Sequence, residues 1–291
     1  MANIDSIVES PICCVAAVFQ KLGSFDHNIW RLIMKLFDSH CHLDDRIYDK
    51  DFKEVLSRAD KAGVSGIMIV GVEKKSSEKA VTLAESKPGL YASVGFHPHD
   101  AKECSKEAIE FLIKLAESPK VKAWGEIGLD FNRMFSPRED QEKWFIRQLE
   151  VADKLNLPVI FHERESDGSL LEILKKQFKP GRTGVIHCFS GSESELNQYL
   201  KLGLYIGITG ILTIKSRGVK LRNLAPLIPA DRILIETDAP YLTPAPEKNK
   251  TRRNEPAFVK SVLLKLAEVR GEEPDDLARV VWENTCRLYN I

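Results

Sequence analysis

The sequence lacks an excess of charge of either sign. Its 291 residues include 42 Lys and Arg against 42 Asp and Glu, which gives a formal net charge of zero. Proteins that bind long nucleic acids through bulk electrostatic attraction usually carry a basic excess. If this protein recognises phosphate groups, it must therefore do so locally, through bound cations or a small number of Arg and Lys side chains.

The sequence also has few features of a secreted or membrane protein. The longest apolar run near the start, residues 11–19, is too short to cross a bilayer, and residues 1–10 contain no Lys or Arg. The six cysteines form no CxxC pair and show no disulfide-framework spacing. We therefore expect a cytoplasmic protein with reduced thiols and no membrane partner.

The main body of the sequence alternates short apolar runs with longer amphipathic stretches. We expect the apolar runs to be strands at residues 36–39, 66–70, 91–95, 122–125, 158–161, 184–187, 204–208 and 232–236. The stretches between them, such as residues 51–62 and 193–202, have the apolar spacing of helices. This strict order predicts the α/β class and a TIM-type (β/α)8 barrel, with two extra C-terminal helices at 256–269 and 274–290.

Residues 1–33 do not follow this alternation. The segment MKLFD at residues 34–38 looks like a natural protein start that leads directly into the first strand. We therefore interpret residues 1–33 as an N-terminal extension that is either poorly ordered or the product of an upstream start codon. Residues 34–291 are expected to form the barrel.

The histidines are concentrated at the ends of the predicted strands. Six of the seven lie there, namely His40, His42, His97, His99, His162 and His187. Active sites of β/α barrels lie at the C-terminal ends of the strands. His40 and His42 are two residues apart, so both side chains should point toward the barrel axis and share one metal ion. An HxH pair alone is a weak signal, because surface or packed pairs have the same spacing.

Two carboxylates complete the pattern. Glu126 follows the fourth apolar run and Asp238 the eighth. A carboxylate in such a place is costly unless it binds a metal or pairs with a neighbouring Arg. The six strand-end residues His40, His42, Glu126, His162, His187 and Asp238 together predict a site for two divalent cations that share a carboxylate. Imidazole and carboxylate ligands suit Mg, Mn or Zn.

With these segments identified, the sequence closely resembles the TatD family of metal-dependent deoxyribonucleases, within the amidohydrolase-like barrels. The resemblance runs from about residue 36 to the C-terminus through DSHCHLD, GFHPHD, GEIGLD, PVIFHER, HCFSG, ETDAPYL and RNEP, in family order. It implies two, sometimes three, divalent ions and cleavage of DNA from the 3′ end. It also implies that His40 and His42 hold the first ion with Glu126 and Asp238, and that Glu126 bridges to a second ion held by His162 and His187.

The expected reaction is hydrolysis of a phosphodiester, an ester bond, by an activated water. Glu126 and Asp238 are the expected catalytic residues, and Asp238 can accept or relay the proton of that water. His97 can bind the substrate phosphate or assist proton transfer, whereas His99 can simply fix its loop. Arg164 can contact phosphate, although a salt bridge to a neighbouring carboxylate is an alternative.

Weaker candidates and other functions remain open at this stage. The basic residues 250–253 can guide a nucleic-acid strand or form a solvated loop, and Phe131, Phe135 and Tyr241 can stack on bases or pack. The expected partner is DNA or RNA, single-stranded or at its 3′ end, without an obligate protein partner. The alternative activity is metal-dependent hydrolysis of an ester, lactone or amide, including D-aminoacyl-tRNA deacylation.

Overall fold

The computed structural model describes residues 34–245 and 247–291, and Lys35–Ile291 form one compact unit. A single sheet of eight parallel strands runs in sequence order. The strands are β1 (Leu36–Cys41), β2 (Val64–Val70), β3 (Leu90–Val94), β4 (Val121–Asp130), β5 (Val159–Arg164), β6 (Gly184–Ile186), β7 (Tyr205–Ile208) and β8 (Ile233–Ile235). The predicted extension, residues 1–33, lies outside the described residues.

The sheet closes at the C-terminal ends of β1 and β8. Cys41 forms a parallel bridge with Ala239. The backbone N–H of Asp238 donates to the carbonyl oxygen of His40 at 3.0 Å, and that of His42 donates to Ala239 at 2.8 Å. These bonds join the segment after β8 to the end of β1, which confirms the predicted eight-stranded barrel.

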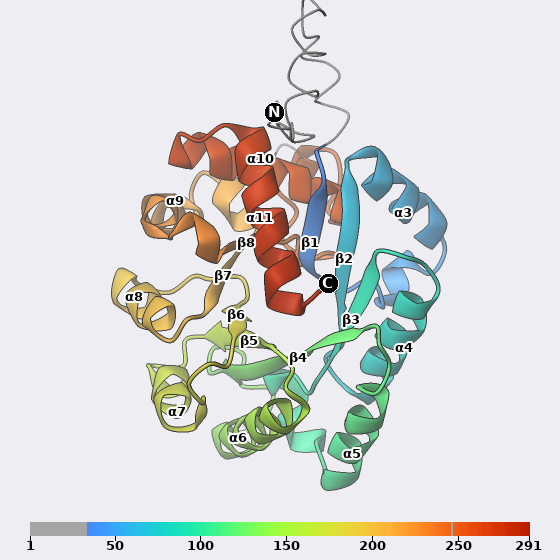
Figure 1. The fold of residues 1–291 in the computed structure, drawn as a ribbon, viewed down its shortest axis with the longest axis vertical. Helices are drawn as coiled ribbons and strands as arrows, with labels where there is room; N and C mark the ends of the chain where they lie inside the picture. The colour runs from blue at the N-terminus through green and yellow to red at the C-terminus, as the bar shows by residue number, and fades with distance from the viewer. Residues whose placement is uncertain (1–33, 246) are drawn as a thin grey trace, which may run out of the picture. The chain divides into compact units, whose positions relative to one another are not determined.

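Helices cover the outside of the barrel (Figure 1). They are α3 (Phe52–Lys61), α4 (Lys74–Glu85), α5 (Lys106–Leu115), α6 (Arg138–Leu155), α7 (Ser169–Gln177), α8 (Glu193–Lys201) and α9 (Val219–Leu224). Each amphipathic helix buries one face against the sheet, as α3 does with Val55, Leu56 and Ala59. Residues 219–227 divide into α9 and a 3-10 turn at Ala225–Leu227, which contains a proline.

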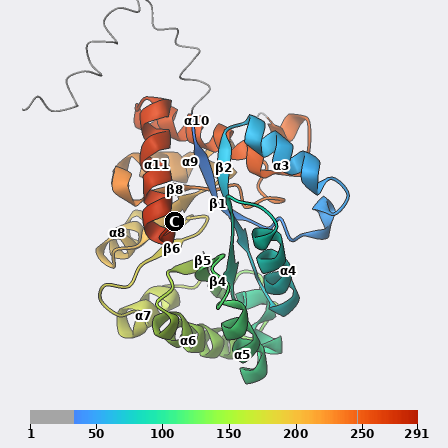
Figure 2. The same ribbon diagram turned by 45° about the vertical axis from the view of Figure 1, so that its right-hand side comes forward.

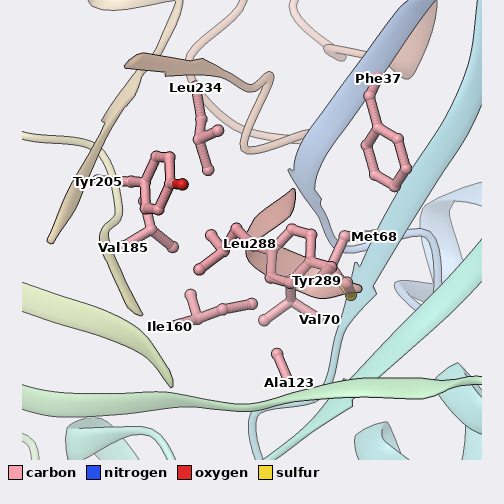
Figure 3. Close-up of a cluster of buried hydrophobic side chains, with 10 residues drawn as sticks. All are labelled: Phe37, Met68, Val70, Ala123, Ile160, Val185, Tyr205, Leu234, Leu288 and Tyr289. Carbon is pink, nitrogen blue, oxygen red and sulfur yellow. The ribbon is translucent and has the colours of Figure 1, made fainter. Parts of the chain in front are cut away.

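The two C-terminal helices, α10 (Val259–Arg270) and α11 (Pro274–Tyr289), are present as predicted. Helix α11 packs beside β1 and β8 (Figures 1 and 2). Its Leu288 and Tyr289 enter the barrel and pack among side chains from the strands, including Met68 and Ile160 (Figure 3). The Asn284 side chain donates to the carbonyl oxygen of Ile233, at the start of β8. Helix α11 therefore closes the N-terminal end of the barrel, and the C-terminal end is left for function.

The strand boundaries place one predicted ligand differently from the expectation. β4 continues to Asp130, whereas the sequence suggested an end at residue 125, so Glu126 lies inside the strand. The pairing register of β4 with β5 shifts between Trp124 and Ile127. This irregularity allows the strand to continue past the glycine at position 125. Among the described helices, none is long and apolar enough to cross a membrane.

Candidate metal centre

The C-terminal ends of five strands bring the six predicted ligands together. They are His40 and His42 at β1, Glu126 in β4, His162 in β5, His187 at the end of β6 and Asp238 after β8. None of these side chains is more than 18% exposed. Parallel strands of a barrel all end at the same rim, so residues that are up to 198 positions apart in the sequence become neighbours.

Glu126 occupies the middle of the cluster, and imidazole nitrogens surround its two carboxylate oxygens. Its Oε2 lies 3.4 Å from Nε2 of His40. Its Oε1 lies 2.6 Å from Nδ1 of His162, 3.6 Å from Nε2 of His97 and 3.9 Å from Nε2 of His187. Each oxygen of this one carboxylate therefore faces a different set of nitrogen atoms, which is the arrangement that a bridging ligand requires.

The first set consists of His40, His42 and Asp238. The Nε2 atoms of the two histidines are 3.3 Å apart, and Oδ1 of Asp238 lies 3.8 Å and 3.4 Å from them. The Nδ1 atom of His42 lies 3.1 Å from the carbonyl oxygen of Val70. Burial lowers the pKa of His42, but Asp238 raises it to about 9, so a cation that binds here would replace the proton on Nε2 while Nδ1–H donates to this carbonyl. Two facing imidazole nitrogens beside a carboxylate are a chemically suitable donor set for a divalent cation.

The second set surrounds Oε1 of Glu126 and includes His162 and His187. Oδ1 of Asp238 also lies 3.6 Å from Nε2 of His187, so the two sets share a boundary. A further group, His97, His99 and His162, has ligand atoms within 4.8 Å of one another. The residues present thus fit the metal ions that the fold and the resemblance imply.

The charges of the cluster depend strongly on one another. Burial raises the pKa of Glu126, but His97 and the other surrounding histidines outweigh burial and hold this pKa well below its usual range. Burial lowers the pKa of His162, yet Glu126 and Asp130 raise it to about 9. Burial and the neighbouring His162 lower the pKa of His97 to about 3 and outweigh the opposing effect of Glu126. A divalent cation that binds beside these carboxylates would replace the imidazole proton that they now stabilise.

Two buried carboxylates contact histidines of the cluster, and neither of them was predicted from the sequence as a site residue. Glu236 is fully buried, with Oε1 2.9 Å from Nδ1 of His187, and it accepts a 2.6 Å hydrogen bond from the backbone N–H of Cys188. Oδ2 of Asp130 lies 2.6 Å from Nε2 of His99 and 3.4 Å from Nε2 of His162. Carboxylates in these positions orient imidazole rings from behind.

A signal for one of the two carboxylates was available in the sequence. Asp130 follows Glu126 by four residues, and even spacing on a strand places two side chains on the same face. The expected end of the fourth strand at residue 125 hid this signal. Glu236 lies beyond the end of β8 at Ile235, so the same rule gives no signal for it. Asp38, also buried, accepts hydrogen bonds from the backbone and hydroxyl of Thr237 and holds the segment before Asp238.

The weaker candidates separate into two groups. His97 lies inside the cluster, and its Nδ1 accepts a hydrogen bond from the backbone N–H of His99. Arg164, at the end of β5, is exposed, and within residues 34–245 and 247–291 it forms no ion pair with another side chain. In the basic segment 250–253, Arg253 forms an ion pair with Asp51 at 2.6 Å. Asp51 directly precedes α3, so this ion pair holds the segment next to the start of that helix.

An eight-stranded β/α barrel with a histidine and carboxylate cluster at the C-terminal ends of its strands belongs to the class of metal-dependent hydrolases. The chain matches the family model described as TatD related DNase over residues 37–290, and it belongs to this family. The family predicted from the sequence motifs is therefore confirmed.

Similar proteins cover nearly the whole barrel. The chain is 40% identical over 258 residues to the 3′-5′ ssDNA/RNA exonuclease TatD of Escherichia fergusonii, a match that covers 88% of this chain and 99% of that protein. It is 43% identical over 259 residues to the protein of the same name from Erwinia tasmaniensis, which covers 88% and 100% of the two chains.

Solved structures agree with this assignment. A TatD homologue from Escherichia coli superposes with a TM-score of 0.81 at 33% identity and covers 89% of this chain and 99% of that one. A TatD family hydrolase from Entamoeba histolytica superposes with a TM-score of 0.80 at 29% identity and covers 88% and 98%. Both support the barrel as the common framework of the family.

Proposed function

We propose that the protein is a divalent-metal-dependent 3′-5′ exonuclease that hydrolyses phosphodiester bonds at the ends of single-stranded DNA or RNA. The observation that carries this proposal is the position of Glu126 between two sets of imidazole nitrogens, in a chain that belongs to the TatD related DNase family. Relatives about 40% identical over the whole barrel are named as exonucleases of this type. The formal net charge of zero fits an enzyme that binds phosphate through bound cations and a few side chains and not through an overall basic surface.

We assign the ligands to two cation sites that share Glu126. His40, His42 and Asp238 would hold the first ion together with Oε2 of Glu126, as their distances of 3.3–3.8 Å support. The second ion would be held by Oε1 of Glu126 with His162 and His187. Mg, Mn or Zn suits these donors, and such ions lower the pKa of bound water and stabilise charge on phosphoryl oxygens.

The remaining chemistry falls to side chains at the cluster. Oδ1 of Asp238 lies within 3.8 Å of three imidazoles, where a carboxylate can take the proton of the attacking water. His97 is neutral at physiological pH because burial lowers its pKa, and its Nδ1 accepts from His99. Its proton is therefore on Nε2, the atom that faces Glu126, where it can donate to a phosphate oxygen. Arg164 is the exposed residue that we assign to the substrate phosphate.

The test is digestion of a 3′-labelled single strand with Mg²⁺ or Mn²⁺, with and without a chelator. We expect metal-stimulated release of nucleotides from the 3′ end by the wild type. Glu126→Gln, which keeps the shape of the side chain, should abolish this release, whereas Glu150→Gln on the outer helix α6 should not. Purified wild-type enzyme that cleaves neither DNA nor RNA in any of these metals would refute the proposal.

The metal assignment has its own test. The double variant Glu126→Ala with His162→Ala should lose divalent metal in elemental analysis, since both proposed sites lose a ligand. A metal content equal to that of the wild type would show that the ligands are wrong, whatever the activity.

We further propose that the enzyme works in the cytoplasm without an obligate protein partner. The cysteines of the described residues, Cys41, Cys104, Cys188 and Cys286, are free thiols, which is typical of a reducing compartment. Fractionation of cells and size measurement of the native protein would test the two statements, and a stable complex with a second protein would contradict the latter.

A further inference from the structure

Exposed apolar side chains gather around the candidate metal centre. Seven large apolar side chains of the described residues are strongly exposed, and four of them lie in segments that follow strands at the C-terminal rim. These four are Ile47, Met134, Phe135 and Tyr241. Large exposed apolar side chains beside a reaction centre commonly mark a binding surface.

The two aromatic residues of this group stand directly beside cluster histidines. Tyr241 is 55% exposed, and its ring centroid lies 6.0 Å from that of His42 in an edge-to-face arrangement. Phe135 is also 55% exposed, and its ring centroid lies 4.8 Å from that of His99. Each aromatic ring therefore contacts the edge of the cluster while much of its surface remains open to solvent.

The two rings lie on different sides of the centre. Tyr241 belongs to the segment after β8, whereas Phe135 belongs to the loop after β4. In a barrel whose strands run in order from β1 to β8, β4 and β8 are on opposite sides of the ring (Figure 1). A phosphate at Glu126, in the middle, would therefore have one aromatic ring on each side.

Buried polar side chains hold the backbone of the two segments that carry these rings. The side chain of Asn254, which is fully buried, donates to the carbonyl oxygen of Tyr241 at 2.6 Å. Ser136, next to Phe135 and also fully buried, donates through its hydroxyl to the carbonyl oxygen of His99 at 2.7 Å. Anchoring of the backbone reduces the entropy that the two segments would lose when a ligand binds to them.

We propose that Tyr241 and Phe135 are stacking platforms for the two bases that flank the scissile phosphate, one base on each ring. Unpaired bases are the ligands whose flat apolar faces fit exposed aromatic rings, and stacking of this kind tolerates any sequence. Paired bases in a duplex are already stacked on their neighbours and cannot lie on both rings. The platforms would therefore select single-stranded ends. This inference rests on the proposed nuclease function and names its specificity determinants.

Binding measurements can test the platforms without cleavage. The ligand is a fluorescent single-stranded DNA whose 3′-terminal linkages are hydrolysis-resistant phosphorothioates, and its anisotropy is followed with the full-length protein in the presence of Mg²⁺. We expect Tyr241→Ala and Phe135→Ala each to raise the Kd by roughly 5- to 150-fold, the range that corresponds to stacking one base on an aromatic ring. Tyr241→Phe and Phe135→Tyr should retain wild-type affinity, because they keep the aromatic face.

Abasic substrates separate stacking from a general structural effect. The loss caused by each Ala variant should disappear on a strand that lacks the base held by that ring, either the terminal or the penultimate one. In cleavage assays with metal, KM should rise more than kcat falls. Leu227→Ala, which removes an equally exposed side chain at the flank of the barrel, is the matched control and should leave Kd unchanged.

Three results would overturn the proposal that the two rings are stacking platforms. They are an unchanged Kd in both Ala variants, an equal loss of affinity on intact and abasic strands, and a wild-type Kd too weak to measure. Failure of the proposed nuclease function would give a different result: the protein would bind single-stranded DNA tightly, and the two Ala variants would weaken this binding, but no metal would support cleavage.

Discussion

Removal of the divalent cations should lower the thermal stability of the barrel by a predictable amount. The proposed ligands come from β1, β4, β5, β6 and the segment after β8, so bound cations connect strand ends around most of the rim. The unfolded chain has no such preformed site, so binding free energy adds to folding free energy. Two cations, each present at about 100 times its Kd, contribute about 2.7 kcal/mol each, or about 5.4 kcal/mol together. In a domain of this size, each kcal/mol shifts Tm by about 2–4 °C, so a shift of about 10–20 °C is expected.

The assay is differential scanning calorimetry of chelator-treated protein, before and after Mn²⁺ or Mg²⁺ is added back. Glu126→Gln should reduce the shift to less than about 2 °C, because Glu126 faces both sets of imidazoles. Glu150→Gln on α6 should keep the wild-type shift. The reasoning fails if the wild type melts at the same temperature with and without cations. It also fails if Glu126→Gln retains the full shift.

Three further outcomes follow from the packing. Leu288→Ala, which empties part of the barrel interior, should lower the free energy of unfolding by about 2–5 kcal/mol in urea titrations, and a change below about 1 kcal/mol would contradict its core position. Gly128→Ala should disrupt the pairing of β4 with β5 and give insoluble or inactive protein, because φ is +151° and a Cβ would lie 1.9 Å from the carbonyl oxygen of His162. Asp51→Asn should destabilise the protein at neutral pH, since hydrogen bonds from Arg253 lower the pKa of Asp51 to about 2. This stabilisation is present above the unfolded-state pKa of about 3.9 and is lost as pH falls toward about 2, so denaturation curves of the two proteins should converge there and should not diverge.

The fold and the clustering of the histidines could be predicted because they depend on local sequence signals. Each strand is a short apolar run, and residues such as His162 and His187 directly follow one. Once eight such runs alternate with helices, the barrel topology brings their ends together without further information. The grouping of these side chains therefore needed only the strand ends and the count of strands.

The remaining features depend on contacts between distant parts of the chain, for which the sequence carries no local signal. Arg253 looked like a solvent-exposed base within a basic segment, yet it binds Asp51, which is 202 residues away. The sequence predicts that the fourth strand ends at residue 125, whereas β4 continues past it. Gly125 approaches Ile160 on β5 so closely that no larger residue fits at this position. The pairing of Glu236 with His187 likewise joins different strands.

The closure of the barrel by α11 has a consequence for the order in which the protein can fold. The hydroxyl of Tyr289 donates to the carbonyl oxygen of Ser39 across 250 residues of sequence, and Leu288 fills the space between strands that are made much earlier. During synthesis, β1 emerges from the ribosome long before the residues that cover its inner face. The interior of the barrel therefore cannot be packed completely until α11 has been translated.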